Sequence, residues 1–145
     1  MSETTNQTTT ALAPWLQEQL VTLRQQRGHA LMLSGPAGLG QYELAYALAK
    51  TWLCEAPTAQ GACGACGGCH AVDQRSHPDL HVLVPEVLAP DLGWPIEAKA
   101  QDEIDRKSRK PSKWIRVDAA RTAVAFTQVT VSRARHQVVL IHPAH

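Results

Sequence analysis

The sequence predicts an α/β fold in which helices flank a parallel sheet, and two observations carry this prediction. Short apolar runs of strand length alternate with longer segments whose apolar residues recur at helical spacing. The first apolar run leads through a glycine-rich turn directly into a helical segment. Strands that alternate with helices favour parallel pairing through right-handed crossovers. We therefore expect each helix to lie on a face of the sheet before the next strand begins.

The composition is that of a soluble globular protein with one domain. The chain has 145 residues, of which 44% are hydrophobic and 19% charged, and this is enough to build a core. A formal net charge of +1 gives no general attraction to nucleic acid. No apolar run approaches the roughly 18 residues of a membrane-spanning helix, and the first residues lack the pattern of a secretion signal. We expect a cytoplasmic protein with no membrane partner.

The first part of the chain holds a polar leader, a helix and a strand. Residues 1–12 are rich in Ser, Thr, Gln and Asn and are expected to be disordered. Residues 15–27 carry apolar side chains at helical spacing, with Pro14 in the first turn and Gly28 as a stop signal. Residues 30–34 are apolar enough to predict a short buried strand.

The middle of the chain holds a second helix, a second strand and a long connection. Residues 43–53, rich in Ala, Leu and Tyr, predict a helix that starts at the end of the glycine-rich turn. Residues 80–85 predict a second apolar strand. Prolines and mixed charges across residues 86–113 predict a long, mobile surface connection.

The last predicted elements are a helix and a third strand. Residues 115–117 are followed by Asp118, a candidate N-cap, and together they open a helix that runs to about residue 131. Residues 137–141 predict the third strand, after which only four residues follow. We therefore expect the sheet of an α/β domain to be truncated after its third strand.

The turn after the first strand has the shape of a phosphate-binding loop but lacks two of its chemical groups. Such a loop follows G-x-x-x-x-G-K-[ST]: backbone N–H groups surround the phosphates, the lysine reaches the β- and γ-phosphates, and the hydroxyl holds Mg²⁺. The glycine frame is kept at Gly35, Gly38 and Gly40. The lysine position holds the uncharged Gln41, and the hydroxyl position holds Tyr42, whose oxygen lies too far along a rigid ring. We expect the loop to be empty, with ATP not bound productively.

A second position needed for ATP hydrolysis also lacks the required residue type. P-loop proteins carry acidic residues after the third strand, where they hold Mg²⁺ and orient water. Here residues 138–141 are followed by His142 and Pro143, and no acid is present. Two independent losses favour an inactive nucleotide site. The alternative is a plain strand-to-helix turn, and the N–H groups at the helix start could still hold a phosphate weakly.

Four cysteines predict a structural metal site. Cys54, Cys63, Cys66 and Cys69 follow the pattern C-x8-C-x2-C-x2-C and use every cysteine of the chain. Residues 55–70, within the module at 54–70, are too rich in glycine to be regular, and the glycines let the backbone fold sharply. In a reducing compartment such a cluster favours a tetrahedral Zn²⁺ site over disulfides. Four thiolates leave no open position for a substrate, so the metal would be structural. It would hold together a segment that lacks apolar residues of its own.

Three other interpretations of the cysteines remain open. The thiols could be free and only incidentally close. An iron–sulfur cluster also uses C-x2-C-x2-C spacing, although a proline usually follows the last cysteine of such runs and here His70 follows. A Cys₃His site with His70 in place of Cys54 would need two adjacent residues to chelate one ion.

Together these features resemble the N-terminal AAA+ module of bacterial clamp-loader subunits. The resemblance covers nearly all of residues 14–145, and residues 13–145 would form one partial AAA+ domain. Its most specific element is the cysteine module directly after the loop helix. The other matching residues are Pro14, Trp15 and Leu16 at the first helix, residues 29–40 up to and including the glycine loop, His77, Pro78 and Asp79 before the second strand, residues 115–118 with Arg121, and residues 138–141.

The resemblance implies a subunit of the machine that opens a ring-shaped sliding clamp and closes it round primed DNA during DNA replication. Gln41, Tyr42 and His142 agree with the ATP-inactive subunit of that machine, which is known as a rigid stator. The implied partners are the gamma or tau and the delta subunits, with the sliding clamp and primed DNA reached through the complex. No intrinsic ATPase is expected, although the complex belongs to a DNA-directed DNA polymerase holoenzyme, a nucleotidyltransferase.

Two other functions are the alternatives. An ATP-hydrolysing subunit of the gamma or tau kind would need a lysine at position 41. A zinc-ribbon nucleic-acid-binding module would bind DNA through the cysteine segment, with a steep dependence on salt.

The resemblance also implies that the strand between the first and third comes from sequence beyond residue 145. We therefore expect the isolated chain to be unstable or to aggregate, because the gap would leave buried backbone groups unpaired.

Overall fold

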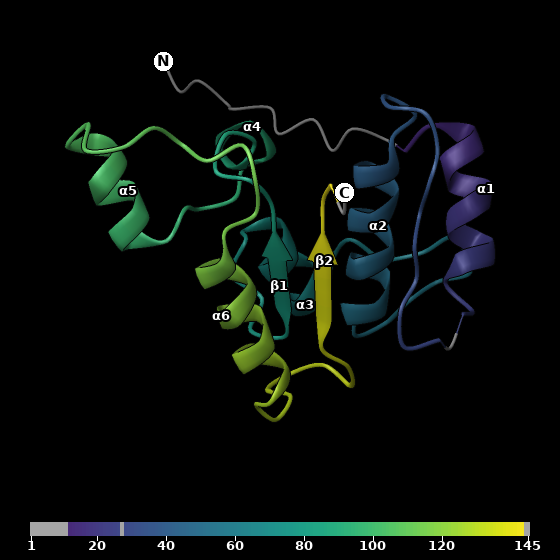
Figure 1. The fold of residues 1–145 in the computed structure, drawn as a ribbon. Coiled ribbons are helices and arrows are strands. Elements are labelled where there is room, and N and C mark those ends of the chain that lie inside the picture. The colour runs from purple at the N-terminus through teal and green to yellow at the C-terminus, as the bar shows by residue number, and fades with distance from the viewer. Residues whose placement is uncertain (1–11, 27, 144–145) are drawn as a thin grey trace, which may run out of the picture.

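The computed structural model describes residues 12–26 and 28–143 and has a mixed helix and strand architecture (Figure 1). The polar leader predicted for residues 1–12 therefore lies, except for Leu12, outside the described residues. In chain order, the elements of the described residues are α1 (Pro14–Leu23), α2 (Gln41–Leu53), α3 (Gly67–Asp73), β1 (Leu80–Leu83), α4 (Ala89–Leu92), α5 (Ala98–Asp105), α6 (Val117–Thr127) and β2 (Val138–Ile141).

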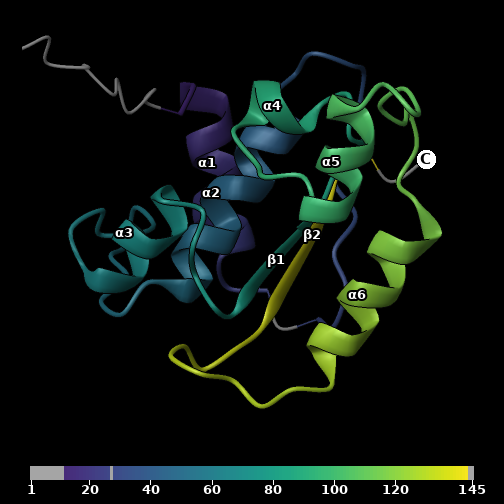
Figure 2. The same ribbon diagram turned by 90° about the vertical axis from the view of Figure 1, so that its left-hand side faces the viewer.

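Two parallel strands form the sheet at the centre of the fold. β1 pairs with β2 in a register that runs from Leu80 opposite Val138 to Leu83 opposite Ile141. α2 packs against β2 on one side, and α6 packs against β1 on the other (Figures 1 and 2). Leu83 and Leu140 are buried between these layers. The predicted parallel α/β arrangement is therefore confirmed for the second and third predicted strands.

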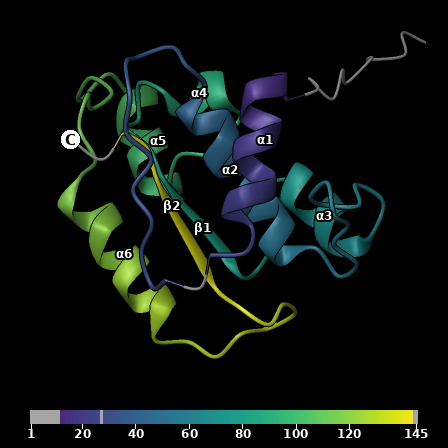
Figure 3. The same ribbon diagram turned by 90° about the vertical axis from the view of Figure 1, so that its right-hand side faces the viewer.

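The first predicted strand, residues 30–34, is wrong. This segment runs as an irregular trace without an arrow (Figures 1 and 3), and no strand among the described residues pairs with it. Its side chains at Leu31 and Met32 are 43% and 81% exposed. An apolar run of this length fits a buried strand, but a strand needs a neighbour to accept its backbone hydrogen bonds. Among the described residues, β1 and β2 pair only with each other, and residues 30–34 do not pair with the free edge of either strand.

The helices begin or end at residues that differ from the predicted bounds. α1 ends at Leu23, four residues before the predicted end, and its buried residue Leu20 forms the core with Leu44 and Leu48 of α2. α6 begins at Val117, with Arg116 in the N-cap position and no side-chain cap. The prediction of Asp118 as N-cap is therefore wrong.

The interval 86–113, predicted as a mobile connection, holds the short helices α4 and α5. Its ends are joined by Arg109, whose guanidinium binds both carboxylate oxygens of Glu86 at 2.7 and 3.0 Å and Glu103 at 2.7 Å. The hydrogen bonds from Arg109 hold the pKa of the Glu86 carboxyl below its ordinary value. No residue of α5 is buried, so the mobility of this helix stays a prediction.

No helix in the described ranges combines the length and the apolar character needed to cross a membrane.

Candidate metal centre and phosphate loop

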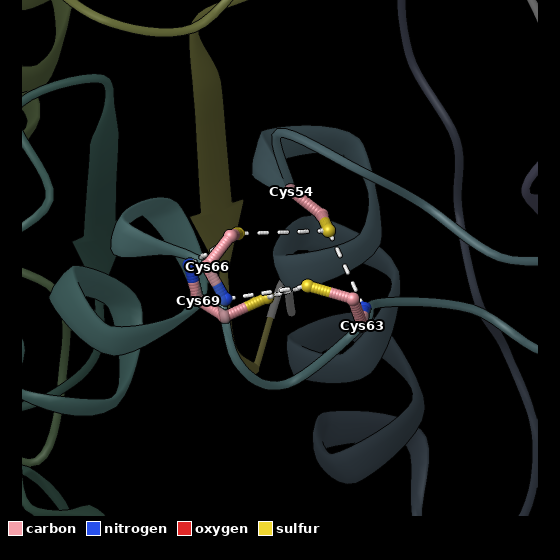
Figure 4. Close-up of side chains that lie close together, drawn as sticks. All are labelled: Cys54, Cys63, Cys66 and Cys69. Atoms are coloured by element: carbon pink, nitrogen blue, oxygen red, sulfur yellow. Dashed lines mark hydrogen bonds between the residues drawn. The ribbon is translucent and has the colours of Figure 1, made fainter.

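All four cysteine sulfurs converge on one point, as Figure 4 shows. They lie within 4.8 Å of one another, with Cys54 and Cys66 3.8 Å apart and Cys63 and Cys69 4.0 Å apart. Sulfurs placed about 2.3 Å from a tetrahedral zinc ion would be about 3.8 Å from each other. The donor set and its spacing therefore fit Zn²⁺.

The cysteines come from the end of one helix, a loop and the start of another helix. Cys54 directly follows α2, Cys63 and Cys66 lie in the glycine-rich loop, and Cys69 lies in α3. The prediction that residues 55–70 are irregular is wrong at its end, because α3 begins at Gly67. Cys66 acts as its N-cap, with its sulfur accepting from the backbone N–H of Cys69 at 3.3 Å.

A glycine lets α3 approach α2 closely enough to join the site. A side chain at Gly68 would place its Cβ 2.7 Å from the backbone oxygen of Leu53, the last residue of α2. Only glycine fits there without a shift of the backbone. Cys54 and Cys69 are consequently held at the junction of the two helices, and both are buried.

Backbone N–H groups surround the sulfurs and favour their charged form. The bonds, each 3.3 or 3.4 Å long, run from Glu55 and Cys69 to Cys66, from Ala56 and Cys63 to Cys54, and from Ala65 and Cys66 to Cys63. Burial opposes ionisation of Cys66, but its N–H donors and the neighbouring thiols together outweigh burial and lower the pKa of this thiol to about 6. Burial raises the pKa of Cys69 to about 12. A metal ion binding all four would therefore release protons.

His70 is not a member of this cluster: the only group that converges among the described residues consists of the four cysteines. His70 is exposed on α3, immediately after Cys69. The geometry favours the Cys₄ set over the Cys₃His alternative.

The glycine loop leads into α2 as predicted, but the side chain in its lysine position turns back on the loop. The amide nitrogen of Gln41 donates to the backbone oxygen of Pro36 at 2.7 Å. Gly40, the N-cap residue of α2, has a φ of 93°, and a Cβ there would lie 2.6 Å from Leu16 of α1. The loop is thus closed on itself and packed against α1.

Tyr42 and His142, the other two residues that depart from the P-loop pattern, contact each other. The ring of Tyr42 lies 5.2 Å from the ring of His142, centroid to centroid. The phenol oxygen of Tyr42 also accepts a hydrogen bond from the indole nitrogen of Trp94. Sequence reasoning missed Trp94, because it lies in a proline-rich connection where no spacing relates it to the loop.

A cleft of about 460 Å³ lies between α1 and the glycine loop. Trp15, Met32 and Leu39 are exposed along it, and Ser34 and Gln41 supply polar groups. The exposed apolar residues of the segment that was predicted as a strand thus form part of an open surface beside the loop.

A glycine loop that opens α2, a cysteine module after that helix and a parallel β1–β2 pair are consistent with a fragment of an AAA+ module. The family described as "DNA polymerase III, delta subunit" has a model that matches residues 9–145. The chain is 37% identical to DNA polymerase III subunit delta' of Pseudomonas aeruginosa over 133 residues, which are 90% of this chain and 34% of that protein. It is 35% identical to the subunit delta' of Escherichia coli over 101 residues, 66% of this chain and 30% of that protein.

The chain belongs to the DNA polymerase III delta-prime family. It spans about a third of the length of the relatives that it matches.

Proposed function

We propose that this chain serves in the delta-prime subunit of the DNA polymerase III clamp loader, as an ATP-inactive stator in loading the sliding clamp onto primed DNA. The observation that carries the proposal is the state of the nucleotide site. Gln41, Tyr42 and His142 stand where an active P-loop protein has a lysine, a hydroxyl and an acid.

The chemistry of these side chains supports inactivity. Phosphoryl transfer depends on cations that neutralise the charge developing on the phosphate oxygens. Gln41 supplies no charge, and its amide is engaged by the oxygen of Pro36. Tyr42 and His142 pack ring against ring in place of the oxygen ligands that Mg²⁺ prefers.

The cysteine module would act as a structural Zn²⁺ site. Four thiolates would complete a tetrahedral shell and leave no position for water or substrate. The bound ion would fix the loop between α2 and α3, which has few apolar side chains of its own.

The proposed partners follow from the delta-prime assignment. They are the gamma or tau subunits and the delta subunit, with the sliding clamp and primed DNA contacted through the complex. A cytoplasmic location agrees with this role, because the reducing cytoplasm keeps thiols free to bind a metal.

Nucleotide binding by the full chain tests the proposal. Titration with Mg²⁺-ATP should give no saturable binding in the micromolar range and no release of phosphate, whereas a gamma-type subunit in parallel should give both. Micromolar binding with turnover would favour the ATP-hydrolysing alternative instead. Loading of the clamp onto primed DNA by a reconstituted complex should still require the protein.

A further inference from the structure

A cluster of aromatic rings around one guanidinium holds the first turn of α2. Its members come from four segments of the chain that lie far apart in sequence: α2, the turn after α3, the loop after α4 and the end of β2. We call this cluster the aromatic lock. It consists of Tyr42, Tyr46, Arg75, Trp94 and His142.

Tyr42 is held from two sides within the lock. The indole N–H of Trp94 donates to its phenol oxygen, and the ring of His142 lies 5.2 Å from its own ring. Burial raises the pKa of Tyr42, so the phenol stays neutral at ordinary pH and places no charge in this cluster. The space between the start of α2 and the end of β2 is therefore occupied by side chains. In active P-loop proteins this space holds Mg²⁺, between the loop hydroxyl and the acid that follows the strand.

Trp94 is in turn held by Arg75. The guanidinium carbon lies 4.7 Å from the centre of the Trp94 ring and 4.9 Å from that of Tyr46, which is cation–π distance for both. One guanidinium nitrogen donates to the Tyr46 oxygen at 2.7 Å, and another donates to the backbone oxygen of Leu92 at 3.2 Å. The Tyr46 hydroxyl donates onward to Asp73 at 2.9 Å. Each polar contact fixes the position of a ring that packs against the next.

We propose that Trp94 and Arg75 are positioning residues that hold Tyr42 across the Mg²⁺ position, so that the loop stays ordered without a nucleotide. The inference rests on the proposed ATP-inactive function and extends it. The protein would then be inactive for two reasons: it lacks the loop lysine, and the contacts of the lock hold Tyr42 where Mg²⁺ would bind. It follows that a lysine at position 41 alone does not restore nucleotide binding.

Hydrogen exchange of the loop peptide, residues 35–44, tests the role of Trp94 in the full chain. Trp94→Phe keeps a ring over Arg75 but removes the N–H donor to Tyr42. The loss of one hydrogen bond is expected to speed exchange of this peptide about fivefold. The matched control is Trp114→Phe, because Trp114 is 71% exposed and takes part in none of the ring and cation–π contacts that define the lock. The same exchange rate in both variants would overturn the inference.

A double-mutant cycle separates this bond from a general loosening of the fold. Tyr42→Phe removes the acceptor of the same bond and should also speed exchange about fivefold. The double variant Trp94→Phe with Tyr42→Phe should exchange no faster than either single variant, because all three lack one shared interaction. Effects that multiply in the double variant would show that the two residues act independently.

Mg²⁺-ATP titration of restored loops tests the blocking role. Gln41→Lys alone should leave binding undetectable, and Gln41→Lys with Tyr42→Thr should bind at least about tenfold more tightly, because the second change clears the Mg²⁺ position. Equal binding by the two variants would overturn the inference. Binding and turnover by the unaltered protein would instead contradict the proposed function, so the two failures are distinguishable.

Discussion

The carboxylate of Asp79 is 1% exposed and fixes the chain that leads into β2. Its oxygens accept from the backbone N–H groups of Ser132, Arg133 and Ala134 at 2.7, 2.8 and 2.7 Å. The backbone N–H of Asp79 donates to the imidazole of His77 at 3.0 Å. Burial alone would raise the pKa of Asp79, but the three N–H donors outweigh burial and hold it below the ordinary value of 3.8.

We expect Asp79→Asn to lower the free energy of unfolding by about 2–3 kcal/mol, because an amide cannot accept from all three N–H groups. The folded pKa is depressed, so this contribution is present above the unfolded pKa and is lost as pH falls through the folded pKa. Urea unfolding between about pH 2 and pH 6 should therefore show a steeper acid loss of stability in the wild type than in the variant. Asp102→Asn is the control, because its side chain is 57% exposed. Parallel pH curves for wild type and Asp79→Asn would contradict the assignment.

At the scale of elements, α3 is the part of the candidate metal centre that can be tested most directly. It begins at the N-cap Cys66, carries Cys69 on its first turn and approaches α2 only because Gly68 has no side chain. The ion pair of Arg133 with Glu55, at 2.8 Å, joins the neighbouring loop to the segment before β2. A bound metal would therefore stabilise more than the loop that supplies its ligands.

We expect the purified protein to contain one zinc ion per chain, measured by elemental analysis beside a thiol count. Cys69→Ser should lose the metal and unfold at a lower temperature, because the buried sulfur would be one of the four proposed ligands. His70→Ala, one residue away on the same helix and exposed, should keep both the metal and the melting temperature. Loss of zinc from His70→Ala, with retention in a Cys54→Ser variant, would support the Cys₃His set.

The sequence was informative about elements wherever a local pattern was enough to define them. The alternation of apolar runs predicted the parallel pairing of β1 with β2, and cysteine spacing predicted the convergence of four sulfurs. Contacts between distant segments were not predictable in this way. The bond from Trp94 to Tyr42 spans 52 residues, and that from Ser132 to Asp79 spans 53. The sequence around one residue of such a pair does not indicate which residue it will bond, because the bond depends on how the elements pack.

The error at residues 30–34 has the same origin at larger scale. The apolar character of residues 30–34 indicated that this segment should be buried. An apolar segment becomes buried only where another part of the fold packs against it. Among the described residues β2 pairs only with β1, and Met32 is 81% exposed. The part of the chain that the structure describes thus presents an apolar segment beside α1 and a free sheet edge at β2, with Ile141 50% exposed.

This exposure predicts the behaviour of the isolated 145-residue chain. Unpaired strand edges and contiguous exposed apolar side chains promote association between copies. We expect the purified chain to aggregate at micromolar concentration, which light scattering would detect. Met32→Lys should reduce the scattering, because it places a charge on the exposed apolar segment. Val124→Lys, on the outer face of α6 and 59% exposed, should reduce it less if the open sheet region is the site of association. A soluble monomer with one cooperative thermal transition would show instead that β1, β2 and their helices are sufficient for a stable core.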